Sequence, residues 1–177
     1  MRRGSGTFLF IDILRSFCQP SQKGRYTMNY RIATIADCDE LTQLRMAMRK
    51  ELDKEFQEEP LLTLTRSFFQ RNIPNGNHVA FVCEDKGQLV ADVGLTLFEM
   101  MPTTKSPNGK VARLMNMYVA PPYRRRGIAQ KLLEISVKYA KEIGCSRMML
   151  NPSEMGKPLY LNFGFQAMDN EYEFYLK

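Results

Sequence analysis

The sequence has little with which to bind a transition metal. His78 is the only histidine in 177 residues, and the four cysteines lie far apart with no CxxC pair among them. Zinc sites are built from clustered cysteine and histidine ligands, so the sequence predicts no metal site. Scattered cysteines are also typical of separate thiols in a reducing compartment rather than of a disulfide framework, which predicts a cytoplasmic protein.

Long hydrophobic runs are absent as well. No stretch of the sequence approaches the roughly 18 apolar residues that cross a membrane, and there is no internal repeat or low-complexity segment. Hydrophobic residues at 44% and charged residues at 25% are ordinary for a globular protein. A length of 177 residues suits one domain with a real core. We therefore expect a single soluble domain without a membrane partner, as a monomer or a homodimer.

The net charge of +6 is concentrated at the beginning of the chain. Residues 1–27 hold five basic residues against one acidic residue, which leaves a charge of +2 for residues 28–177. The main part is nearly balanced, so we expect no nucleic-acid partner. A signal peptide is one interpretation of residues 1–27, but their apolar run is short, contains Asp12 and Arg15, and precedes no small-residue cleavage pattern. We interpret them as a peripheral extension and residues 28–177 as the domain.

Apolar periodicity and turn residues predict alternating strands and helices from Tyr30 onward. A capping box at Thr34–Asp37 is expected to open the first helix, with Leu41, Leu44, Met48 and Leu52 on its buried face, and a second helix follows Pro60. Further helices are expected at 128–143 and within 153–162. The expected strands are 30–33, 78–83, 89–98, 111–119, 148–150 and a closing hairpin of 165–168 with 172–176. The predicted order is β-α-α-β-β-β-α-β-α-β-β.

The segment from Met117 to Leu133 combines a strand, a turn and the start of a helix. The first N–H groups of a helix lack internal partners and carry partial positive charge, so such a turn suits a pyrophosphate. Arg124, Arg125 and Arg126 add charge with forked donors that fit phosphate oxygens, and Gly127 allows close approach. A solvated basic turn is the simpler interpretation. The strand before the turn and the helix after it favour the anion site.

This segment resembles the acetyl-CoA motif of the GCN5-related N-acetyltransferase superfamily, written R/Q-x-x-G-x-G/A. Arg124, Gly127 and Ala129 occupy its three defined positions. A second segment, Gly156–Phe165, is similar to the family's G-x-x-L-Y-x-x-x-G-F pattern, and the element order from Tyr30 to Leu176 also resembles that of the family. The resemblance implies a single α/β domain of mixed α+β type, in which about four helices flank a twisted, mostly antiparallel mixed sheet.

The resemblance also implies acetyl-CoA as the cosubstrate. Backbone groups of Met117 and Val119 are then expected to pair with the pantetheine arm like an added strand, and backbone N–H groups near Tyr118 to polarise the acetyl carbonyl. N–H groups from Arg125 to Ala129 are expected to hold the pyrophosphate. The residues implied to bind acetyl-CoA are Met117, Tyr118, Val119, Arg124, Arg125, Arg126, Gly127, Ile128 and Ala129.

Tyr160 lies where many members of that family place a tyrosine beside the CoA sulfur as general acid. A phenol in that position protonates, or donates a hydrogen bond to, the departing thiolate. The alternative is a core tyrosine packed like Leu159 and Phe163. With both sequence patterns present, we favour the catalytic role for Tyr160, and we expect Ser153 to cap its helix.

The usual general base of the family is missing from its usual place. Acetyl transfer requires a neutral amine, whereas an alkylamine has a pKa of about 10.4 and is mostly protonated at neutral pH. Many members carry an acidic residue near the end of the strand, where this chain has Met115 and Asn116. Glu99, Glu51 and Asp53 are possible substitutes, and Asn116 orienting a water molecule is a fourth.

The acceptor is less well determined by the sequence than the donor. In the family it resembles, substrate-facing residues come from the first two helices, the loop Met100–Gly109 and the last hairpin. We expect a small-molecule amine first and a protein lysine or N-terminus second. The acidic stretch Glu51–Glu59 offers a negative surface to a cationic acceptor. A non-catalytic acyl-CoA-binding regulatory module is the competing class, because the strand carboxylate is missing.

Overall fold

A computed structural model describes residues 28–168, which form one mixed sheet with helices on both faces. The five strands lie in the order of the sequence: β1 (Asn29–Ile32), β2 (His78–Asp85), β3 (Gln88–Glu99), β4 (Lys110–Val119) and β5 (Arg147–Met149). Neighbouring strands are antiparallel, except that β4 and β5 are parallel. The predicted mixed, mostly antiparallel sheet is therefore confirmed.

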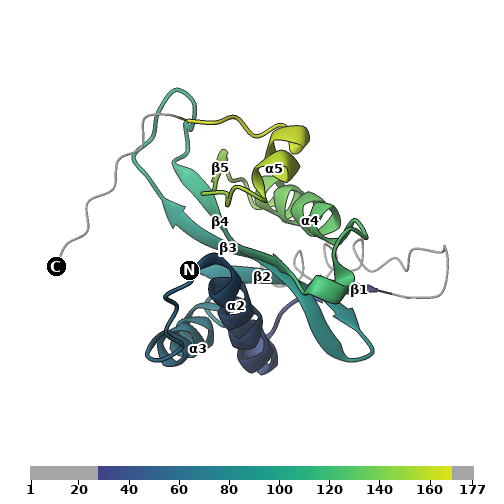
Figure 1. The fold of residues 1–177 in the computed structure, drawn as a ribbon. Helices are drawn as coiled ribbons and strands as arrows, with labels where there is room; N and C mark the ends of the chain where they lie inside the picture. The colour runs from purple at the N-terminus through teal and green to yellow at the C-terminus, as the bar shows by residue number, and fades with distance from the viewer. Residues whose placement is uncertain (1–27, 169–177) are drawn as a thin grey trace.

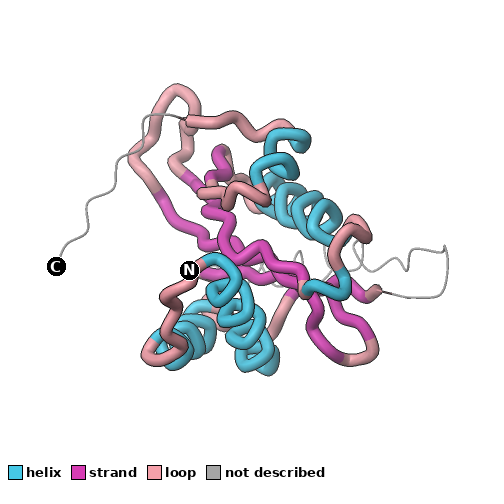
Figure 2. Tube along the Cα trace, viewed as in Figure 1, coloured by secondary structure: helices cyan, strands magenta, loops and turns pink. Residues whose placement is uncertain are grey.

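Four α-helices of the described residues flank this sheet, as predicted: α2 (Cys38–Leu52), α3 (Leu61–Asn72), α4 (Ile128–Glu142) and α5 (Lys157–Phe163). Two short 3-10 helices, η1 (Ile35–Asp37) and η2 (Pro121–Tyr123), precede α2 and α4. The helices α2 and α3 lie on one face of the sheet, and α4 and α5 on the other (Figure 1). Figure 2 shows the sheet as the middle layer between the two pairs. Within residues 28–168, every helix falls short of the length and apolarity that crossing a bilayer requires.

The alternation of side chains along the strands builds a core on each face of the sheet. In β2, Phe81 belongs to the cluster that contains Leu132 of α4, whereas Val82 belongs to the cluster that contains Leu41 of α2. Successive strand residues point to opposite faces, so a strand with apolar residues at consecutive positions is covered on both sides. The central strands β2 and β3 are therefore buried along most of their length.

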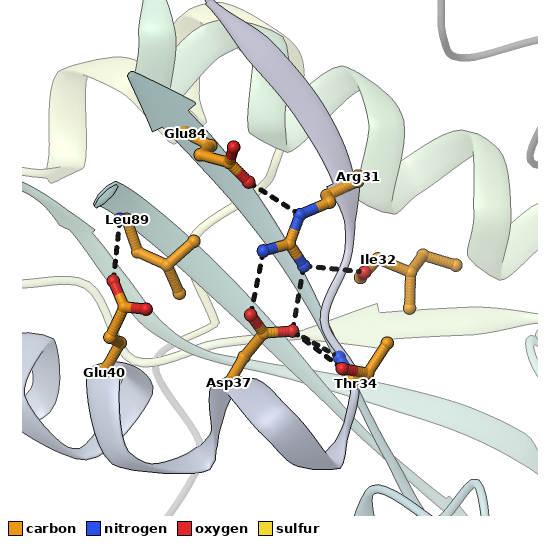
Figure 3. Close-up of polar contacts among 7 residues, drawn as sticks. All are labelled: Arg31, Ile32, Thr34, Asp37, Glu40, Glu84 and Leu89. Carbon is orange, nitrogen blue, oxygen red and sulfur yellow. Dashed lines mark hydrogen bonds and ion pairs between the residues drawn. The ribbon is translucent and has the colours of Figure 1, made fainter. Parts of the chain in front are cut away.

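A polar network fixes the start of α2 against the sheet (Figure 3). The Asp37 carboxylate accepts the Thr34 N–H at 2.6 Å, as the capping box predicts, and forms an ion pair with Arg31 of β1 at 2.8 Å. The Arg31 hydrogen bonds hold the pKa of Asp37 below its usual value. In α2, Glu40 accepts the N–H of Leu89 at 2.9 Å. These contacts fix the position of α2 on the sheet. They therefore also fix where the side chains of α2 lie relative to the strands.

The structure departs from the predicted elements in three places. Leu52, which was expected on the buried face of α2, is 49% exposed, and its neighbours in the last turn of that helix are exposed as well. Residues 165–168 form no strand, and the expected partner strand 172–176 lies outside the described residues, as does the proposed extension 1–27. Gly156, rather than Ser153, is the N-cap of α5, and the Ser153 hydroxyl accepts the Gly156 N–H one turn earlier.

Candidate active site

The strand β4 contains one extra residue relative to its neighbour β3. Gly94 pairs with Met115, whereas Asp92, two residues earlier in β3, pairs with Tyr118, three residues later in β4. Asn116, inside this bulge, has a left-handed φ of 56°. Bulges bend a strand and change which way its side chains point, and they are common next to active sites.

The bulge shifts the alternation of β4 by one position. Met115 and Asn116, although consecutive, both line a pocket beneath α2 and α3, and Tyr118 packs in the core cluster of the same face. Met117 and Val119 pack on the opposite cluster, beneath α4. Because of the bulge, Met115 and Asn116 line the pocket on one face of the sheet, whereas the next residue, Met117, packs on the opposite face.

Beyond the bulge, β4 is an edge strand on the side of β5. The pairing with β5 ends at Arg113 and Met149, so Met117–Val119 have no strand partner there among the described residues. An open strand edge accepts an extended ligand as an added strand. One group is already engaged within the chain, because the Val119 carbonyl accepts a hydrogen bond from Nε of Arg124 at 2.8 Å.

The first turn of α4 begins at Gly127. This residue is the N-cap, with a left-handed φ of 78°, and no side chain of residues 28–168 caps this end of the helix. The first closing bond runs from the Lys131 N–H to the Gly127 carbonyl, so the N–H groups of Ile128 and Ala129 have no partner within the helix. A Cβ at Gly127 would meet no atom of the described residues within 4 Å. The left-handed backbone conformation is thus what favours glycine at this position.

The Arg124 side chain contacts α2 and β4. Its guanidinium forms an ion pair with Glu51 of α2 at 2.6 Å and lies 5.6 Å from the centre of the Tyr118 ring. The Tyr118 hydroxyl also donates to Glu51, at 3.0 Å. Arg124 therefore ties the turn to β4 and to the end of α2.

The next two arginines stand at the exposed rim of the turn. Arg125 has a left-handed φ of 60°, and Arg126 donates a hydrogen bond to the Pro122 carbonyl at 2.7 Å while its guanidinium lies 5.2 Å from the centre of the Tyr123 ring. Both side chains are exposed. They supply positive charge around the turn.

Tyr160 of α5 lies in the core cluster on the α4 face, the cluster on which Met117 and Val119 pack. It is 7% exposed, its ring meets that of Phe165 edge to face at 5.8 Å, and burial raises its pKa to about 12. The hydroxyl forms no hydrogen bond with any residue of 28–168. Tyr160 is thus a packed core residue that keeps its proton and has an unused donor.

The three carboxylates considered as bases do not line the pocket beneath α2 and α3. Glu51 is held by Arg124, and Asp53 forms an ion pair with Arg49 at 3.2 Å. Glu99 is exposed at the end of β3. Of the four candidate groups, Asn116 alone lines that pocket.

A buried carboxyl that the sequence patterns did not single out lies behind Asn116. Asp92 of β3 is 1% exposed, and its Oδ2 accepts a hydrogen bond from the Asn116 amide, whose Oδ1 in turn accepts one from Nη1 of Arg45 at 3.2 Å. The other oxygen of Asp92 has no partner among the described residues. Burial raises the pKa of Asp92 to about 8, although Asn116 and Arg45 oppose the rise. In the sequence, this buried carboxyl could have been found as the one charged residue within the apolar run of residues 89–95.

Asp92 is expected to make the fold less stable as the pH rises. Its pKa is higher in the folded state than in the unfolded chain, where it is about 3.9, so the folded state binds the proton more tightly. The free energy of unfolding should therefore fall between about pH 5 and pH 8. Asp92→Asn should flatten this decline, as urea unfolding at several pH values measures. Parallel curves for the two proteins would contradict the raised pKa.

The pocket itself lies between α2, α3 and the bulge of β4. Its volume is about 220 Å³, below the roughly 300 Å³ at which sites for drug-sized ligands begin. Leu61, Leu64, Phe68 and Phe69 of α3 form most of its apolar wall. The first two helices thus surround a cavity of the size of a small molecule.

Side chains suited to metal binding do not cluster in the part of the chain that the structure describes. Among residues 28–168, no three or more His, Cys, Asp and Glu side chains gather in a way that would hold a metal ion. Cys38, Cys83 and Cys145 carry free thiols.

Comparison with known proteins identifies the family of this chain. The "Acetyltransferase (GNAT) family" model matches residues 42–165. An uncharacterized N-acetyltransferase of Escherichia coli, YjgM, is 30% identical over 95 residues, which are 52% of this chain and about half (53%) of that protein. A predicted acetyltransferase from Clostridium acetobutylicum, solved with acetyl-CoA, superposes with a TM-score of 0.76 at 28% identity, over 84% of this chain and 96% of that one. A GCN5-related N-acetyltransferase from Ralstonia eutropha gives 0.74 at 27% identity, over 82% and 97%. With 124 of its 177 residues matched by the family model, the chain belongs to the acetyltransferase (GNAT) family.

Proposed function

We propose that the protein transfers the acetyl group of acetyl-CoA to the primary amine of a small molecule, by direct attack of the amine on the thioester. The observation that carries this proposal is that the open edge of β4 leads, through η2 and the arginine turn, into the uncapped start of α4. The start of α4 offers N–H donors to an anion, and the edge of β4 offers backbone groups to an extended amide chain. Family membership supports the same donor.

The chain's own groups divide the binding of acetyl-CoA between them. N–H groups of Gly127, Ile128 and Ala129 hold the pyrophosphate, with Arg125 and Arg126 adding charge at the rim. Backbone groups of 117–119 hold the pantetheine arm. Arg124 positions the turn, because its contacts with Glu51 and the Val119 carbonyl hold the turn against β4.

During transfer, a C–N bond forms as the C–S bond breaks, and the electron pair leaves on sulfur. Backbone N–H groups near Tyr118 stabilise the negative charge that develops on the carbonyl oxygen. The Tyr160 hydroxyl, protonated because its pKa is about 12, donates to the departing sulfur. Asn116, which lines the pocket, orients a water molecule that accepts the proton of the amine.

Two measurements on the full chain test this proposal. Calorimetry should detect acetyl-CoA binding, and a thiol assay should detect CoA release in the presence of a panel of primary amines. Binding without release for any amine would favour a non-catalytic acyl-CoA-binding regulatory module instead. Release only with peptides would favour a protein lysine or N-terminal acetyltransferase. A protein that does not bind acetyl-CoA would contradict all three.

A further inference from the structure

Arg45 of α2 places a charge in an otherwise largely apolar pocket. Its guanidinium donates one hydrogen bond within residues 28–168, to the Asn116 amide oxygen at 3.2 Å, and forms no ion pair with a described carboxylate. Arg49, one turn later in the same helix, pairs with Asp53. Arg45 is half-buried, so its unused donors are partly removed from water as well.

The nearby acid, Asp92, does not supply the missing anion. It lies behind Asn116, is completely enclosed by protein, and accepts its hydrogen bond from the Asn116 amide rather than from Arg45. Burial raises its pKa to about 8, so near neutral pH it is mostly protonated and uncharged. An arginine remains charged at any accessible pH. The pocket therefore holds a positive charge that forms no ion pair with any carboxylate of residues 28–168.

The surroundings of Arg45 define what else a ligand would meet. Phe68 and Phe69 form an edge-to-face pair in the wall, at 5.9 Å between ring centres, and Leu61 continues the apolar surface. Leu64, which is 61% exposed, lies in the same wall and gives it an open side. An arginine fork matches a carboxylate, and this wall matches an apolar side chain.

Resting on the proposed function, we infer that the acceptor is a free amino acid with an apolar side chain. Its carboxylate pairs with Arg45, its side chain packs on Phe68 and Phe69, and its amine lies toward the bulge at Asn116. The amine nitrogen forms the C–N bond and loses its proton to solvent as CoA departs. A protein lysine or N-terminus would present a peptide group to Arg45 in place of the carboxylate.

The carboxylate requirement is tested by calorimetry with two ligands that lack an amine, 3-phenylpropanoate and 3-phenylpropanamide. The wild type should bind the acid about 10- to 100-fold more tightly than the amide, because charge-assisted hydrogen bonds exceed neutral ones. Arg45→Gln should bring this ratio close to one, and Arg45→Lys should give an intermediate ratio, since lysine keeps the charge without the fork. Arg49→Gln, one turn away and outside the pocket lining, should keep the wild-type ratio.

A ratio near one in the wild type, or a preference that survives in Arg45→Gln, would overturn the inference. Arg45→Lys and the wild type decide the matter if Arg45→Gln does not fold. Turnover separates this inference from the proposed function. Higher kcat/KM for phenylalaninamide or peptides than for phenylalanine would contradict the amino-acid acceptor and leave acetyl transfer standing. Carboxylate-dependent binding without CoA release from any amine would contradict acetyl transfer instead.

Discussion

Tyr160→Phe should lower kcat by about 100- to 10,000-fold while the affinity for acetyl-CoA stays close to that of the wild type. The substitution removes one hydroxyl and keeps the ring that packs on Phe165. That hydroxyl forms no hydrogen bond within residues 28–168, so its removal leaves no group of those residues unpaired. Steady-state kinetics and calorimetry together measure the two effects.

Tyr139→Phe is the matched control. Tyr139 of α4 is also buried in the same core cluster, and burial raises its pKa to about 12 as well. Loss of its hydroxyl should cost about 1 kcal/mol of stability and leave kcat within about twofold. If Tyr160→Phe resembled Tyr139→Phe in kcat, Tyr160 would be a core residue only, which is the alternative that its sequence position left open.

Gly127→Val should raise the dissociation constant of acetyl-CoA by at least about 100-fold. Valine at a φ of 78° is strained by about 1–3 kcal/mol, which disturbs the first turn of α4. A charge-assisted hydrogen bond from a backbone N–H to a phosphate oxygen is worth about 1.5–3 kcal/mol, so the loss of two such bonds accounts for the change. Calorimetric titration with acetyl-CoA measures it.

The other end of the same helix provides the control for this variant. Gly144 follows α4 with a φ of 81°, and a Cβ there would also meet no atom within 4 Å. Gly144→Val should therefore lose a comparable amount of stability in thermal unfolding and keep its affinity for acetyl-CoA. Equal losses of affinity in both variants would mean that the effect comes from a weakened fold and not from the phosphate turn.

Local patterns predicted the fold well wherever neighbouring residues determine the structure. The capping box at Thr34–Asp37 depends on a few consecutive residues, and it is confirmed. Burial was harder to predict. Leu52 follows the helical period of Leu41, Leu44 and Met48 and is nevertheless 49% exposed, because a helical period does not show how far the rest of the protein extends beside the helix.

The candidate site also combines features that consecutive residues predict with features that depend on residues far apart in the sequence. The turn at Gly127 was recognisable from consecutive residues, whereas the link from Arg45 through Asn116 to Asp92 joins α2, β4 and β3 and has no local pattern. The bulge at Asn116 was equally hidden, because it is an offset between two strands rather than a property of one. Arg124 illustrates the limit of a motif, since its position was predicted and its ion pair with Glu51 was not.

The most direct test of acetyl transfer follows the acetyl group itself. The full chain is incubated with acetyl-CoA labelled in the acetyl group, with phenylalanine present or absent, and mass spectrometry and a thiol assay quantify the products. Direct transfer predicts one N-acetylated amine for each CoA released, and no label on the protein when the acceptor is omitted. CoA release without an acetylated amine, or label retained on the protein before the acceptor is added, would contradict direct transfer.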